Sequence, residues 1–103
     1  MYYTEILIVP TVTEPGDVEI WEGEDVKLVT KVTGKPEPVV EWFHGYRKMV
    51  QSSDTAIGRD GKTHTLHLKE RQIEDSGTIT VTATNKAGTC SAESKLTVKG
   101  VQT

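Results

Sequence analysis

The most constraining feature of this chain is an alternation of apolar and polar side chains that recurs between turn-forming residues. In residues 26–32 the alternation places four side chains on one face of an extended strand, namely Val26, Leu28, Thr30 and Val32. Apolar spacing typical of an amphipathic helix is scarce. The pattern predicts an all-β chain of about seven strands, as in a β-sandwich, with strands in residues 18–20, 26–32, 39–43, 62–69, 78–84 and 89–99.

Glycine- and proline-containing segments separate these strands. Residues 34–38 are expected to close the strand that begins at Val26, and residues 85–88 form a turn before the last strand. The pair Asp60-Gly61 predicts a hairpin with a type I′ turn, in which both central residues need a positive φ. A helical turn is expected only in residues 70–75.

Length and charge exclude several classes of partner. The 103 residues suffice for one domain, and 12 Lys+Arg against 15 Asp+Glu give a net charge of -3. A nucleic-acid-binding domain normally carries a basic excess, which is missing. The longest aliphatic run, residues 6–9, is far shorter than the roughly 20 residues of a membrane-spanning helix. We therefore expect neither nucleic acid nor a membrane as a partner.

Cysteine content indicates a reducing compartment. Cys90 is the only cysteine, so no disulfide can form within the chain, whereas small domains of oxidising compartments usually have one. The only asparagine, Asn85, is not followed by the Ser or Thr that glycosylation requires. Both observations favour a cytoplasmic protein.

No residue pattern predicts catalysis, a cofactor or a metal. His64 and His67 are an odd number of positions apart in a predicted strand, so their side chains leave opposite faces and cannot share one ion. We expect His44 in a turn and all three histidines at the surface. Ser76 beside Asp75 fits a turn better than a nucleophile with its base. The chain is therefore predicted to be no enzyme and to have no small-molecule substrate.

Charge is unevenly distributed along the chain. Residues 1–26 hold seven acidic residues and no basic one, whereas the remainder has a net charge of +4. This segment is either a solvated acidic face or a surface that meets a basic partner or a neighbouring module. The best candidates for a partner contact elsewhere are Arg47 and Lys48, beside Tyr46 and Met49.

Five segments in order resemble the immunoglobulin domain of the intermediate set (I-set): residues 22–28, 34–38, 41–43, 65–68 and 74–88. The likeness extends from about Pro10 to Lys99, and within the family it is greatest to the repeated modules of giant intracellular muscle proteins such as titin and twitchin. The resemblance implies an immunoglobulin-like β-sandwich with Greek-key connections and two antiparallel sheets.

The departures from the family pattern concern the core. Trp42 stands where the family has its core tryptophan, but Thr30 and Val81 occupy the positions of the inter-sheet cysteines, and Ile79 replaces the tyrosine of the tyrosine corner. No disulfide is therefore expected, and the Thr30 hydroxyl is expected to bond locally to a carbonyl. The resemblance implies a structural core of Trp42, Thr30, Val81, Leu28, Leu66, Leu68 and Ile79.

The resemblance further implies a non-enzymatic structural and protein-interaction module of a tandem-domain muscle or cytoskeletal protein, located in the cytoplasm at the sarcomere. Its partners would be neighbouring immunoglobulin or fibronectin type III domains and other muscle or cytoskeletal proteins. Under load, terminal strands on opposite sheets would resist shear. The alternatives are an extracellular cell-adhesion receptor module and a regulatory module adjoining a kinase.

The expected domain limits follow the same likeness. Residues 10–99 form the domain, residues 1–9 are a linker or an extra N-terminal segment, and residues 100–103 are a C-terminal tail. We expect the first strand to begin at Val12. The aliphatic residues 6–9 then form either a contact with a preceding domain or an added edge strand.

Overall fold

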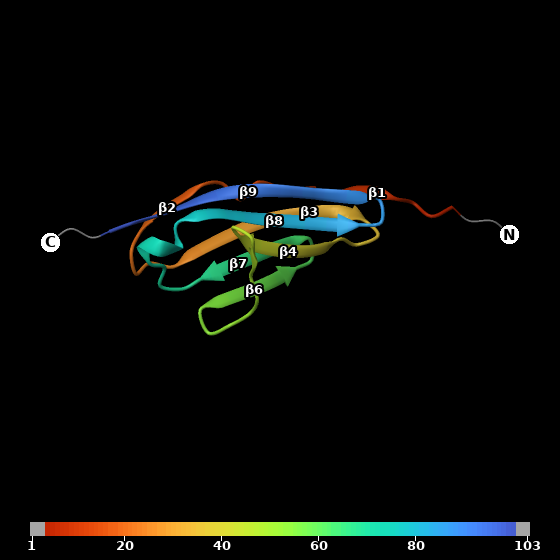
Figure 1. Cartoon of the computed structure of the whole chain (residues 1–103). Helices are drawn as coiled ribbons and strands as arrows, with labels where there is room; N and C mark the ends of the chain where they lie inside the picture. Colours follow the sequence, from red (N-terminus) through yellow and green to blue (C-terminus); the bar gives the residue numbers. More distant parts are fainter. Residues whose placement is uncertain (1–3, 101–103) are drawn as a thin grey trace.

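Two β-sheets pack face to face in the computed structural model, which describes residues 4–100 (Figure 1). The elements are β1 (Ile8–Val12), β2 (Val18–Trp21), β3 (Val26–Lys35), β4 (Val39–His44), β5 (Arg47–Lys48), β6 (Thr55–Asp60), β7 (Thr63–Leu68), a 3-10 helix η1 (Ile73–Asp75), β8 (Gly77–Asn85) and β9 (Gly88–Lys99). One sheet has the order β1-β3-β7-β6 and the other β2-β9-β8-β4-β5. The all-β immunoglobulin-like sandwich is thus confirmed.

The described residues form nine strands rather than about seven, because the first strand divides between the sheets and a short β5 is added. β1 pairs antiparallel with β3, whereas β2 pairs parallel with β9 in the other sheet. The remaining pairings are antiparallel. The chain therefore changes sheets between Val12 and Val18.

The core lies between the two sheets and is built from the inward positions of the alternating strands. Trp42 on β4 pairs with Val81 on β8, which pairs in turn with Ala92 on β9, and all three side chains face inward. Each buried aliphatic or aromatic side chain contributes about 1.5–3 kcal/mol through the hydrophobic effect. The seven residues of the expected core are each at most 2% exposed: Trp42, Thr30, Val81, Leu28, Leu66, Leu68 and Ile79.

Thr30 joins the core to the point where the chain changes sheets. Its buried hydroxyl donates a hydrogen bond of 2.5 Å to the carbonyl oxygen of Thr13, and the amide of Thr13 donates to the carbonyl oxygen of Lys31. The expected bond to a carbonyl is present, but its acceptor is 17 residues away and so is not local. Antiparallel pairing of β1 with β3 brings Thr13 to this position.

The first strand begins at Ile8, four residues before the expected start at Val12. Ile8 pairs with Lys35, and the register then shifts before Thr11. Pro10, which has no amide hydrogen, lies within this shift and is buried. No sequence pattern indicates this earlier start, because the aliphatic residues 6–9 do not alternate with polar residues.

The hairpin expected at Asp60-Gly61 is present between β6 and β7, but its turn differs from the prediction. Asp60 pairs with Thr63, so the two loop residues are Gly61 and Lys62. Of these only Gly61 has a positive φ, 62°, which is the requirement of a type II′ turn. Because Asp60 still belongs to β6, the central residues of the turn are Gly61 and Lys62 rather than Asp60 and Gly61. The helical turn expected in residues 70–75 is present as η1.

Replacing Trp42 with alanine should lower the free energy of unfolding by about 3–5 kcal/mol, because it leaves a cavity between the sheets. Chemical denaturation followed by circular dichroism measures the change. Tyr46→Ala is the matched control, since this fully exposed aromatic residue should change stability by less than about 0.5 kcal/mol. Equal losses in both variants would contradict the assigned core.

Thr30→Val should lower the free energy of unfolding by roughly 1 kcal/mol, since it removes the donor to the Thr13 carbonyl while keeping the side-chain volume. Hydrogen exchange should also become faster at the amide of Thr13. Thr78→Val, at an exposed position of β8, is the control and should change neither quantity. Unchanged exchange at Thr13 in Thr30→Val would show that the bond does not hold the crossover.

Candidate functional site

The three histidines lie apart from one another. His64 is opposite the inward-facing Thr30, whereas His67 is opposite Lys27 on the outer face, with its Nε2 3.4 Å from a carboxylate oxygen of Asp25. His44 is the last residue of β4 rather than a turn residue, and it is only partly exposed because it packs against Gly77. No group of three or more His, Cys, Asp or Glu residues within 4–100 is arranged to hold a metal ion.

The hairpin between β4 and β5 presents the three expected contact residues together. His44 pairs with Arg47 across a two-residue turn of Gly45 and Tyr46, and Gly45 has a φ of 60°. The amide of Gly45 donates to the carbonyl oxygen of Thr78, which fastens the turn to β8. The Tyr46 side chain is fully exposed at the tip. The turn therefore displays an aromatic ring next to two cationic side chains.

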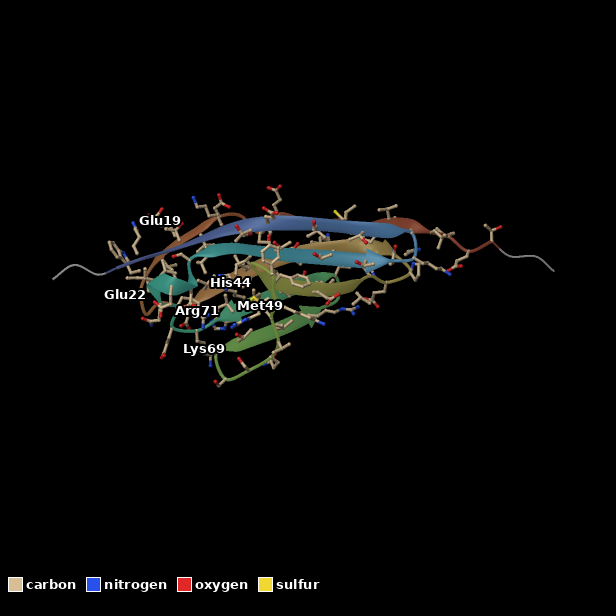
Figure 2. The ribbon with its side chains drawn as sticks, viewed as in Figure 1. Glu19, Glu22, His44, Met49, Lys69 and Arg71 are labelled. Atoms are coloured by element: carbon tan, nitrogen blue, oxygen red, sulfur yellow. The ribbon has the colours of Figure 1, made fainter. Side chains whose placement is uncertain are left out.

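A groove lies beside this hairpin, between it and the segment before the 3-10 helix. We call it the hairpin groove; Figure 2 shows three of its residues, and its lining includes His44, Arg47, Lys48, Met49, Asp54 and Arg71. Met49 packs against the core, and its amide donates to the carbonyl oxygen of Trp42. The groove floor is thus anchored to the centre of the fold.

Charges within the hairpin groove are largely compensated. The mostly buried Arg71 guanidinium donates to Asp54 at 3.1 Å and to the carbonyl oxygen of Lys69. Hydrogen bonds from Ser52, Thr55 and Arg71 lower the pKa of Asp54 below its usual value. Asp54 therefore stays ionised and fixes Arg71 in place.

The two cations of the hairpin differ in their surroundings. Lys48 lies 3.0 Å from Glu41, whereas no carboxylate among residues 4–100 lies within ion-pair distance of Arg47. Arg47 is exposed beside the aromatic ring of Tyr46. Arginine and tyrosine side by side are enriched at protein interfaces, where both form strong contacts. The hairpin tip is the best candidate for a partner contact on this face.

The acidic residues of segment 1–26 do not form one face. Glu5 pairs with Lys86 at the β8–β9 turn, whereas Glu19 pairs with Lys99 near the opposite end of the sandwich. The hydrogen bond and charge of Lys99 lower the pKa of Glu19. Folding therefore separates acidic residues that are close in sequence.

Asp25, also from this acidic segment, is held by groups far along the chain. The pKa of Asp25 is lowered mainly by a hydrogen bond from the amide of Glu70 and to a smaller extent by one from His67. Glu70 has a positive φ of 48°, and its amide points toward Asp25 in this conformation. The contact fixes the loop after β7 against the loop before β3.

Two features of the structure were not predicted from the sequence. The first is the exposure of Trp21 at the end of β2 and of Ile73 in the 3-10 helix. The second is that Asn85 ties three segments together, because its side-chain amide donates to the carbonyl oxygens of Ile8 and Pro36, each at 2.9 Å. The outward position of Trp21 in an alternating strand was the one available signal.

Residues 10–98 match the model of the immunoglobulin I-set domain. The chain is 37% identical over 87 residues to smooth muscle myosin light chain kinase of Gallus gallus and 36% identical over 83 residues to palladin of Mus musculus. These alignments cover 84% and 80% of the chain but only 5% and 6% of the relatives. The chain thus spans a small fraction of the proteins that it matches.

Solved structures of titin domains have the same fold. A chain of a chimeric titin Z1Z2 structure superposes with a TM-score of 0.88 at 31% identity, covering 93% of this chain and 100% of that one. A chain from the complex of titin M10 with the obscurin-like 1 Ig domain gives a TM-score of 0.89 at 28% identity, covering 95% of this chain and 100% of that one. None of the described helices has the length and hydrophobicity to span a bilayer. The match of the family model to residues 10–98 shows that the chain belongs to the immunoglobulin I-set domain family.

Proposed function

We propose that the chain is a non-enzymatic structural and protein-interaction module of a tandem-domain muscle or cytoskeletal protein, located in the cytoplasm at the sarcomere. The observation that carries this proposal is the position of the two ends. The chain enters the sandwich at one end of its long axis and leaves at the other (Figure 1), so that successive modules join end to end. Relatives named for muscle, including the muscle M-line assembly protein unc-89 of Caenorhabditis elegans at 39% identity, support the location.

The pairing of β2 with β9 suits a module that carries load. The strands run parallel in continuous register from Val18 opposite Leu96 to Trp21 opposite Lys99. A force that pulls the ends apart loads these hydrogen bonds together in shear. β2 and β9 belong to the same sheet. The expected shear between terminal strands of opposite sheets therefore applies only to β1, which lies in the other sheet.

The hairpin tip serves as the contact for a partner protein in this proposal. Arg47 and Tyr46 together fit an acidic surface that also offers apolar area to the ring. Titin domains of the same fold occur in complexes with obscurin-like 1 and with telethonin, and these precedents support a muscle or cytoskeletal protein as the partner.

A regulatory module beside a kinase is the second candidate. It is favoured by the relatives that carry kinases, namely smooth muscle myosin light chain kinase and the twitchin kinase region of C.elegans, which matches with a TM-score of 0.86 at 27% identity. In that case the hairpin tip would contact the kinase. The sequence flanking the module in its full-length protein distinguishes the two.

Reversing the charge of the hairpin should abolish partner binding. We expect Arg47→Glu combined with Lys48→Glu to lose specific proteins that the wild type retains from muscle extract, because two cations facing an acidic surface become anions. Lys27→Glu with Lys31→Glu, exposed on the other sheet, is the matched control and should retain them. Both variants should remain folded; Lys48→Glu removes the exposed ion pair with Glu41, which contributes at most about 1 kcal/mol. Equal retention by both would exclude the hairpin tip as the contact.

Unfolding under force should release nearly the whole domain. Residues 10–98 contain no disulfide, so their extended length is roughly 300 Å before the folded length is subtracted. Single-molecule stretching should give this extension equally with and without reductant. A shorter extension that reductant restores would reveal a covalent link.

A further inference from the structure

Two exposed apolar side chains flank the point where the chain leaves the sandwich. Trp21 is 51% exposed and pairs with Lys99, whose ammonium lies 4.7 Å from the centre of the indole ring. Ile73 is 49% exposed, and its Cδ1 lies 3.0 Å from where a Cβ on Gly100 would be. We call Trp21 and Ile73 the exit patch. We take this end as a candidate contact surface because exposed aromatic side chains such as that of Trp21 are enriched at protein interfaces.

The exit patch lies within an acidic end of the molecule. Residues 19–25 and 69–75 together with Lys99 hold seven carboxylates and three cations, a net charge of -4. Figure 2 shows Glu19 and Glu22 near this end of the ribbon. A partner for the exit patch therefore needs apolar side chains on a surface without excess negative charge.

The opposite end of the molecule has these properties. Residues 6–9, which we call the entry arm, are exposed apolar residues, and Ile6 is 64% exposed. The arm is held in place, since Asn85 donates to the carbonyl oxygen of Ile8 and Lys86 pairs with Glu5. The surrounding segments, residues 5–9, 35–39, 59–62 and 85–88, carry four cations and three carboxylates, a net charge of +1.

We propose that the exit patch binds the entry arm of a second copy of this chain in head-to-tail order. The contact covers apolar side chains on both surfaces, and the opposite net charges of the two ends favour this orientation over a meeting of two acidic ends. The proposal rests on the tandem arrangement of the proposed function, but it does not involve the hairpin tip.

The two surfaces are different, so the contact is heterologous and each copy keeps one free end. Between separate molecules it should be weak. Within a tandem of such modules, the covalent connection raises the effective concentration to about the millimolar range, where a weak contact is populated. The contact would then set the orientation of one module relative to the next.

Complementation between two variants tests the proposal. The exit variant carries Trp21→Ser and Ile73→Ser, and the entry variant carries Ile6→Ser and Leu7→Ser; all four residues are exposed, and thermal unfolding checks that each variant folds. At about 1 mM the wild type should self-associate in sedimentation equilibrium. Either variant alone should associate at least about tenfold more weakly. A 1:1 mixture should form a heterodimer, because each variant keeps the surface that the other lacks.

Tryptophan signals identify the surface that is bound. The chain has two tryptophans, and Trp42 is buried. The Trp21 indole N–H resonance of the entry variant should therefore shift when the unlabelled exit variant is added, while that of Trp42 stays in place. Raising the salt from about 0.05 to 0.5 M should weaken the association, since the Debye length falls.

Tyr46→Ser is the control, because it removes an exposed aromatic residue that belongs to neither the exit patch nor the entry arm, and it should associate like the wild type. A monomeric wild type at about 1 mM, or a mixture of the two variants that stays monomeric, would overturn the proposal. Self-association lost equally in Tyr46→Ser would place the contact at the hairpin instead. Pull-down with the exit and entry variants separates this result from the proposed function, since their hairpins are intact.

Discussion

Packing around Trp42 is the interaction on which the rest of this structure depends. The indole lies between the sheets beside Val81, which together with Thr30 occupies the positions where immunoglobulin domains of oxidising compartments carry their inter-sheet disulfide. Such a bond, closing a loop of about 50 residues, would stabilise the domain by roughly 4 kcal/mol. Here apolar burial holds the sheets together without a covalent link.

The change of sheet in the first strand determines how the two ends of the module are used. Thr30, at a disulfide position, bonds to the carbonyl oxygen of Thr13 and so fastens this crossover to the core. β2 can then lie parallel to β9, and the entry and exit points fall at opposite ends of the sandwich. Thr30 thus belongs both to the core and to the contacts that hold the crossover.

We propose different contacts for the hairpin tip and for the two ends of the sandwich. The hairpin tip offers Tyr46 and Arg47 on a turn that is bonded to β8, so a partner meets a preformed surface and little conformational entropy is lost on binding. The two ends carry exposed apolar residues and opposite net charges. The proposed side contact and the proposed end contact use different residues, so they can form at the same time.

The sequence by itself determined the sandwich and its inward residues, because the two-residue period assigns each strand position to one face. It also determined the absence of an internal disulfide, because Cys90 is the only cysteine. Tyr46, Arg47 and Lys48 could also be expected to lie together, because they are adjacent in the chain. Tertiary structure alone decided the start of β1 at Ile8, the type II′ turn at Gly61 and the parallel β2–β9 pair. It also separated Glu5 from Glu19 and placed Lys99 beside Trp21. These features depend on which distant strand lies alongside, and no local pattern encodes that pairing.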